Sequence, residues 1–157
     1  MGDTGRVADR RDVHPHHLLR AVLTDPMVRD VLVELGSSAD EVLLTLDHEW
    51  LAASDTIDLE EIAAVGIDLV TVLTAVNPPF DEAPDWGGRR LTDTTRDLLV
   101  RSLGLRSLTH GPRVHAGHLL LALMASKDRL VAATFRAHGL SGRDARAVVE
   151  RWSRRAP

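Results

Sequence analysis

The chain has 157 residues, of which 44% are hydrophobic, and this is enough for one domain with a substantial core. It contains no cysteine, which excludes disulfides and thiolate metal sites. No apolar segment is long enough to cross a bilayer and no signal-peptide pattern is present, so we expect a cytoplasmic protein that does not enter a membrane. The net charge of −4 and the scattered tryptophans do not favour nucleic-acid binding.

The first half of the chain predicts three helices. Residues 1–12 are polar and can supply at most a short, frayed turn. Pro15 and Pro26 each favour the first position of a helix, where the missing N–H costs nothing. Gly36 predicts a left-handed stop, and Ser38 then caps a third helix.

The second half begins with connecting segments. Residues 55–76 predict two short helices separated by Gly66, and residues 77–90 have the Pro and Gly content of a surface loop. Thr92 then caps a long helix, and the helix over 116–125 is apolar on most of its circumference, as expected in a core. No segment alternates as a strand does, so the sequence predicts an all-α fold.

One motif, Val-His-x-x-His-Leu-Leu-x-Ala, occurs at residues 13–21 and again at residues 114–122, 101 positions later. Similarity continues downstream, where Gly36 has a counterpart in Gly139. A helical unit is therefore duplicated, and we expect the two copies to be related by a pseudo-twofold axis with the motif helices packed at the centre. The expected organisation is a single domain over 1–157, with repeat one at 13–50, connecting helices at 55–76, a loop at 77–90 and repeat two at 91–155.

The motif histidines suggest a metal site, because imidazole alone can bind zinc or nickel. His14, His16 and His17 cluster at the first copy, and a metal sensor is therefore one alternative function. However, no carboxylate follows at ligand spacing, and His17 and His118 directly precede a Leu-Leu pair that we expect to be buried. We favour structural histidines that donate to backbone carbonyls, with no cofactor.

Catalytic patterns are missing from the sequence. It contains neither a phosphate-binding glycine loop nor the common hydrolase and zinc-protease motifs, so we do not expect an enzyme. The adjacent Glu60 and Glu61 lie at a predicted helix start, where they complement the helix dipole. All positive side chains except Lys127 are arginines, a bias that indicates genome composition rather than a function.

Both halves resemble the repeat of the Clp N-terminal domain, the all-α module that precedes the ATPase rings of ClpC-type and ClpA-type protein unfoldases. The family motif has the form I/V-G-T-E-H-L-L-L-x-L-L, which Val114, His118 and the leucines at 119–121 match. Leu91 and Thr92 stand where the family's second repeat opens with F-T-P-R-A. The resemblance covers nearly the whole chain, and the connector at 66–69 is similar to that of short, free-standing family members.

The resemblance implies a recognition module without catalysis. Its ligand would be a protein or peptide, with a Clp ATPase, its adaptor or a cyclic peptide as the partner, and the chain would act as an adaptor, a regulator or a ligand decoy. In the family, part of the antibiotic-binding groove is formed at the start of the second repeat. The corresponding residues here are Leu91, Thr94, Arg96, Leu99 and Val100.

His16 and Gly117 replace the acidic residues that meet the guanidinium of phosphoarginine in family members. Without these carboxylates the guanidinium loses its charged acceptors, so the resemblance implies weak phosphoarginine binding. A protonated His16 would in addition repel the guanidinium. Glutamate at both positions should then restore affinity.

The N-terminal helix of the family has no room in residues 1–12, so we expect the first repeat to lack it. Its loss should leave Leu18 and Val22 less covered, and exposed apolar surface tends to mark interaction sites. We expect either a homodimer or a cover formed by the helices at 55–76, and we favour the homodimer. A structural protein that oligomerises through this face is the other alternative function.

Overall fold

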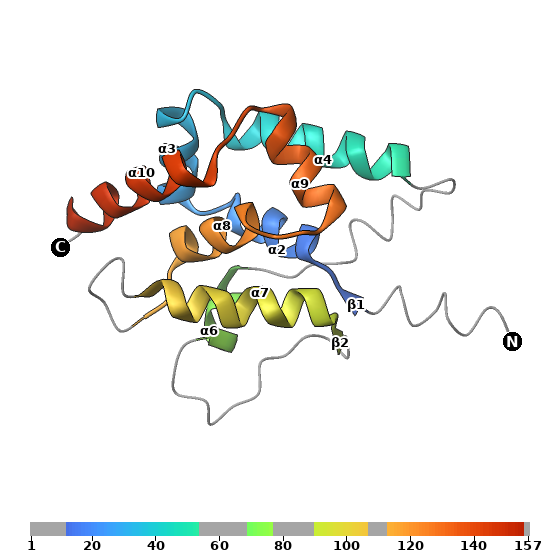
Figure 1. The fold of residues 1–157 in the computed structure, drawn as a ribbon, viewed down its shortest axis with the longest axis horizontal. Helices are drawn as coiled ribbons and strands as arrows, with labels where there is room; N and C mark the ends of the chain where they lie inside the picture. Colours follow the sequence, from blue (N-terminus) through green and yellow to red (C-terminus); the bar gives the residue numbers. More distant parts are fainter. Residues whose placement is uncertain (1–11, 54–68, 77–89, 107–112, 156–157) are drawn as a thin grey trace, which may run out of the picture.

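The computed structural model describes residues 12–53, 69–76, 90–106 and 113–155 (Figure 1). Within these ranges the fold is all-α, as predicted, and it contains eight helices and one parallel pairing of two-residue strands. None of the helices in this part of the chain is both long and apolar enough to span a membrane. The elements are β1 (Asp12–Val13), α2 (Pro15–Val22), α3 (Pro26–Glu34), α4 (Ala39–Ala53), α6 (Leu69–Val76), β2 (Arg90–Leu91), α7 (Asp93–Gly104), α8 (Ala116–Met124), α9 (Arg129–Ala137) and α10 (Gly142–Arg155).

The local start and stop patterns of the sequence are confirmed. Pro15 and Pro26 occupy the first positions of α2 and α3. Thr92 caps α7 by accepting a hydrogen bond of 3.1 Å from the N–H of the third helical residue. Gly36 and Gly139 follow α3 and α9 with φ of 88° and 62°, a left-handed conformation that side chains with a Cβ rarely adopt.

Helices α2 and α8 lie at the centre of the molecule (Figure 1). Helices α6 and α7 cover them on one side, and α3, α4, α9 and α10 lie on the other. The two central helices pack against each other, and their Leu-Leu pairs are fully buried. The apolar motif helices therefore form the centre of the described core, as the sequence predicts.

The outer helices pack across the two halves of the chain. Helix α3 packs against α10, and α4 packs against α9. His138 caps α9 and lies between two hydroxyls of the first half, 3.3 Å from Ser37 Oγ and 2.7 Å from Thr45 Oγ1. At the other end, the Trp152 indole donates a 2.8 Å hydrogen bond to a carboxylate oxygen of Glu34. Polar contacts therefore join α9 and α10 to the first half.

A short parallel pairing fixes α7 to the segment that enters α2. Asp12 pairs with Arg90, and Val13 pairs with Leu91. The buried Thr95 hydroxyl also donates a 2.7 Å hydrogen bond to the Val13 carbonyl. A two-residue strand has no alternation that a sequence pattern could reveal, which is why none was predicted.

The expected exposure of Leu18 and Val22 is wrong, because both side chains are fully buried. Helix α6 packs against α2 and α7, and its Val72 is fully buried as well. The chain thus covers this face itself, and the reason for favouring a homodimer no longer holds. The N-terminal segment, the first connecting helix and the loop at 77–89, on which we made predictions, lie outside the described residues.

The buried position of Leu18 can be tested with a matched pair of truncations. Leu18→Ala should lower the free energy of unfolding by about 2–5 kcal/mol, because it removes core contacts and leaves a cavity. Leu44→Ala is the control, since Leu44 is 69% exposed on α4. This substitution should lower the free energy of unfolding by no more than about 0.5 kcal/mol. Urea denaturation measures both values. If both variants lost equally little free energy of unfolding, Leu18 would lie at the surface rather than in the core.

Candidate functional site

Each motif places a histidine at the third position of its helix. The Nδ1 atom of His17 accepts the backbone N–H of His14 at 2.9 Å, and the Nδ1 atom of His118 accepts that of His115 at 3.0 Å. His17 and His118 are both buried. A ring nitrogen that accepts a hydrogen bond carries no proton, so the proton of each neutral ring is on Nε2. At Nδ1 these histidines therefore accept from the backbone, whereas the sequence predicted donation to it.

The first copy carries a third imidazole, that of His16, which is only 6% exposed. Its ring centroid lies 4.3 Å from that of Trp50 in a T-shaped contact and 4.0 Å from that of His17, and the His14 ring is stacked parallel to it at 5.6 Å. The Nδ1 atom of His16 has no hydrogen-bond partner in the structure.

The pKa of His16 is lowered to about 2, mainly by burial and in addition by charge repulsion from His17, His14 and Arg20. The side chain is therefore neutral near pH 7. The condition for repulsion of a guanidinium, a protonated His16, is therefore not met near pH 7, and the carboxylate of the family motif is still missing at this position.

The second copy has Gly117 in place of His16, and the space beside it is occupied. A Cβ at this position would lie 2.9 Å from Cε1 of His115 and 2.9 Å from Cγ1 of Val149, which is closer than carbon atoms approach without displacement. Any side chain here would therefore have to displace His115 or Val149. Glutamate at this position would have to displace the same atoms, so the expectation that it would restore a guanidinium site is not supported.

His115 lies near the hydroxyl of Ser153, and the two side chains resemble the base and the nucleophile of a hydrolase. Its Nε2 atom is 3.3 Å from Ser153 Oγ, while its Nδ1 atom accepts the backbone N–H of Gly117 at 3.1 Å. Because Nδ1 is the acceptor, the neutral ring carries its proton on Nε2 and donates it toward the serine. In this arrangement His115 cannot remove the serine proton as a general base.

Metal ligation was the other chemical hypothesis for the histidines. In the residues that the structure describes, no group of three or more His, Cys, Asp or Glu side chains is placed to hold a metal ion. The metal-sensor alternative therefore gains no support from the geometry.

The predicted ligand residues at the start of repeat two do not form one surface. Leu99 is buried at 6% exposure and Leu91 is half-buried in β2. Arg96 and Val100 are exposed one turn apart on α7, with Val100 at 62%, and Thr94 is exposed at the far edge of the same side. Arg96 and Thr94 thus lie at opposite edges of one continuous exposed side of α7, with Val100 and Asp97 between them.

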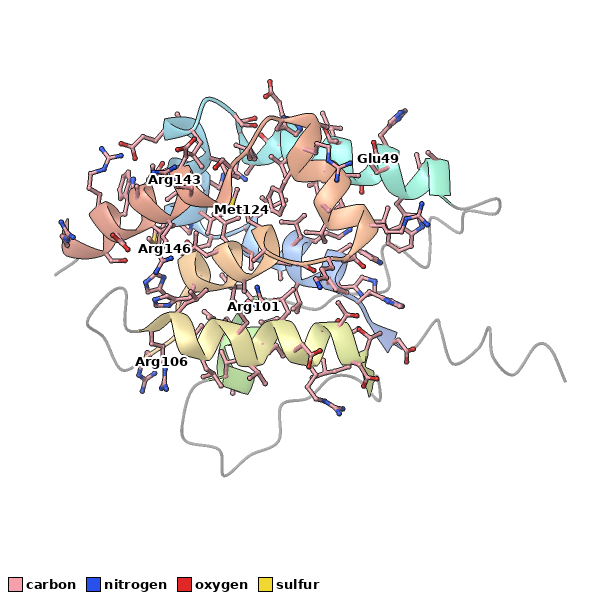
Figure 2. All side chains as sticks on the ribbon, viewed as in Figure 1. Glu49, Arg101, Arg106, Met124, Arg143 and Arg146 are labelled. Carbon is pink, nitrogen blue, oxygen red and sulfur yellow. The ribbon has the colours of Figure 1, made fainter. Side chains whose placement is uncertain are left out.

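Thr94 is the predicted residue that lines a groove of about 290 Å³ between α7 and the C-terminal end of α8. The other lining residues are Asp97, Leu98 and Arg101 of α7, with Ala122, Ala125, Ser126 and Lys127 at the end of α8 and after it. Figure 2 shows Arg101 between α7 and α8. We take this groove, hereafter the α7–α8 groove, as the candidate binding site.

Sequence reasoning missed most of this groove. Thr94, Asp97 and Arg101 follow one another at spacings of three and four residues, which marks one face of a helix. Small residues also replace leucine at the end of α8, just before the single lysine, Lys127. Both patterns are visible in the sequence, but only the packing of the helices shows that this face of α7 lies beside the end of α8.

Comparisons with models of known protein families, with curated proteins and with solved structures each found no match to this chain.

The packing around Gly117 predicts a stability difference between two glycine substitutions. Gly117→Ala should lower the free energy of unfolding by about 1–3 kcal/mol, because the added methyl group overpacks the site. Gly104→Ala is the control, since a Cβ at Gly104 meets nothing within 4 Å. Urea denaturation of both variants decides the point. A Gly117→Ala protein as stable as the control would show that the His115 ring and Val149 move aside easily.

The buried histidines predict a stability that falls with acidification. Burial, with His115 and Arg106, lowers the pKa of His118 to about 4, and that of His16 is about 2. Unfolded histidines protonate below about pH 6.5, so under that pH the unfolded chain binds more protons than the folded one. Between pH 6.5 and 4, each of these histidines should lower the free energy of unfolding by about 1.4 kcal/mol for every unit by which the pH falls.

Urea denaturation between about pH 7.5 and pH 5 measures this slope. His16→Phe keeps an aromatic ring against Trp50 and should make the slope shallower. His48→Gln is the control, because His48 is exposed on α4. If His16→Phe and wild type showed the same dependence on pH, His16 would not be buried in its neutral form.

Proposed function

We propose that the protein is a non-catalytic module that binds a protein or peptide and serves a Clp-type unfoldase as an adaptor, a regulator or a ligand decoy. The observation that carries this proposal is the duplicated motif, which resembles the Clp N-terminal repeat in both halves of the chain. Its two histidine-started helices lie at the centre of an all-α fold, which agrees with the architecture that the resemblance implies.

We infer that the two repeats are related by a pseudo-twofold axis between α2 and α8. In support, the contact of α3 with α10 has a counterpart in the contact of α4 with α9. Helix starts and stops also match, since Asp25 and Asp128 cap α3 and α9, and a left-handed glycine follows each of these helices. An axis of this kind would exchange each element with its counterpart.

The chemistry of the histidines favours binding over catalysis. The Nδ1 atoms of His17, His115 and His118 accept backbone N–H groups at the starts of the two central helices. These bonds satisfy helix-start donors that burial would otherwise leave unpaired. Such histidines act as structural groups, and a loss of function on substitution would follow from misfolding rather than from lost chemistry.

Helix α7 offers the surface that a partner would contact. Arg96 and Val100 are exposed together at one edge of its solvent-facing side, and the α7–α8 groove lies along the other edge. An exposed valine beside an arginine combines apolar area with a cation, and arginine is among the residues that carry most binding energy at interfaces.

The proposal can be tested with a purified ClpC-type ATPase, its peptidase and a fluorescent protein substrate. We expect the protein to co-elute with the ATPase and to change the rate of substrate degradation. The double variant Arg96→Glu with Val100→Glu should weaken the association about tenfold or more. Arg143→Glu on α10 is the control, because Arg143 is exposed on another helix (Figure 2). If about 100 μM protein neither co-eluted nor changed the rate, the proposal would be refuted.

A further inference from the structure

The α7–α8 groove exists because the end of α8 has small side chains. Leucines occupy residues 119–121 in the middle of α8, whereas the residues that line the groove at its C-terminal end and just beyond it are Ala122, Ala125 and Ser126. Leu98 and Ala122 are almost fully buried and give the groove an apolar floor. A compact apolar side chain could therefore lie on this floor and remove both surfaces from water.

Three charged side chains that line the same groove have no partner among the described residues. Asp97 and Arg101 are one helical turn apart, a spacing at which opposite charges commonly pair. Within the described residues, however, neither of them nor Lys127 forms an ion pair or a side-chain hydrogen bond. Two cations and one carboxylate thus face the groove with their hydrogen-bonding capacity free for a ligand.

The charges select among classes of ligand. A simple anion such as phosphate would meet two cations but would also be repelled by Asp97. The last residue of a peptide presents three groups at once, namely a terminal carboxylate, the N–H of its own amide and a side chain. The carboxylate suits Arg101 and Lys127, the N–H suits the Asp97 carboxylate, and an apolar side chain suits Leu98.

We propose that the α7–α8 groove binds the C-terminal end of a peptide or protein whose last residue is apolar. The terminal carboxylate pairs with Arg101 and Lys127, the last backbone N–H donates to Asp97, and the last side chain packs on Leu98 and Ala122. This inference rests on the proposed function, because it names the class of peptide that the module takes. A chain that ends in an amide, or in a charged residue, would be rejected.

Fluorescence anisotropy with an N-terminally fluorescein-labelled peptide, Ser-Gly-Ser-Leu-Leu, tests the inference on the full chain. The peptide with a free carboxylate should bind at least about tenfold tighter than the same peptide with a C-terminal amide. Arg101→Ala should reduce that affinity about tenfold, and Ala125→Trp should abolish binding by filling the groove. The control is Arg136→Ala, which removes an exposed arginine of α9 and should bind as wild type does.

Three results would each overturn the inference: equal affinity for acid and amide, no saturation up to about 1 mM peptide, or equal effects of Arg101→Ala and Arg136→Ala. Displacement of the peptide by inorganic phosphate at similar concentration would also overturn it, since the site would then recognise any anion. This assay contains no unfoldase. Failure here together with co-elution with the ATPase leaves the proposed function intact, whereas peptide binding without co-elution refutes only the link to the unfoldase.

Discussion

The fold depends on a single kind of bond, made twice, in which a buried imidazole accepts a backbone N–H at the start of a central helix. Helices α2 and α8 are both buried on nearly all sides, and the half-buried residues that precede them, His14 and His115, each present a backbone N–H at the helix start. His17 and His118 accept these groups and are themselves covered. Because the acceptor lies within the motif, the N–H that precedes each helix is paired where the helix enters the core, and the leucines that follow pack at the centre.

The two motif copies differ at three positions, and the exchange of His16 for Gly117 changes the packing most. In the first half, the His16 ring packs against the rings of His14, His17 and Trp50. In the second half, the space beside Gly117 is filled by the ring of His115 and by Val149. The first copy thus has one additional buried ring, that of His16. In the second copy, the ring of His115 occupies the space beside Gly117. Neither arrangement offers the carboxylate of the motif that the chain resembles.

Local chemistry explains which parts of the fold could be read from the sequence. Prolines at helix starts, left-handed glycines and the apolar motif act over a few residues, so their positions were predicted correctly. The pairing of β1 with β2 and the cover by α6 join segments far apart in the chain, and no local pattern encodes them. The α7–α8 groove is of the second kind, since Lys127 and Arg101 belong to elements that only packing brings together.

The contacts of His138 with Ser37 and Thr45 have a consequence for how the chain folds during synthesis. These residues are about a hundred positions apart, and α3 and α4 likewise pack on α10 and α9. The first half leaves the ribosome with apolar faces whose partners have not yet been made. Native packing must therefore await nearly the whole chain, and the high separation of these contacts favours slow, late and highly cooperative folding.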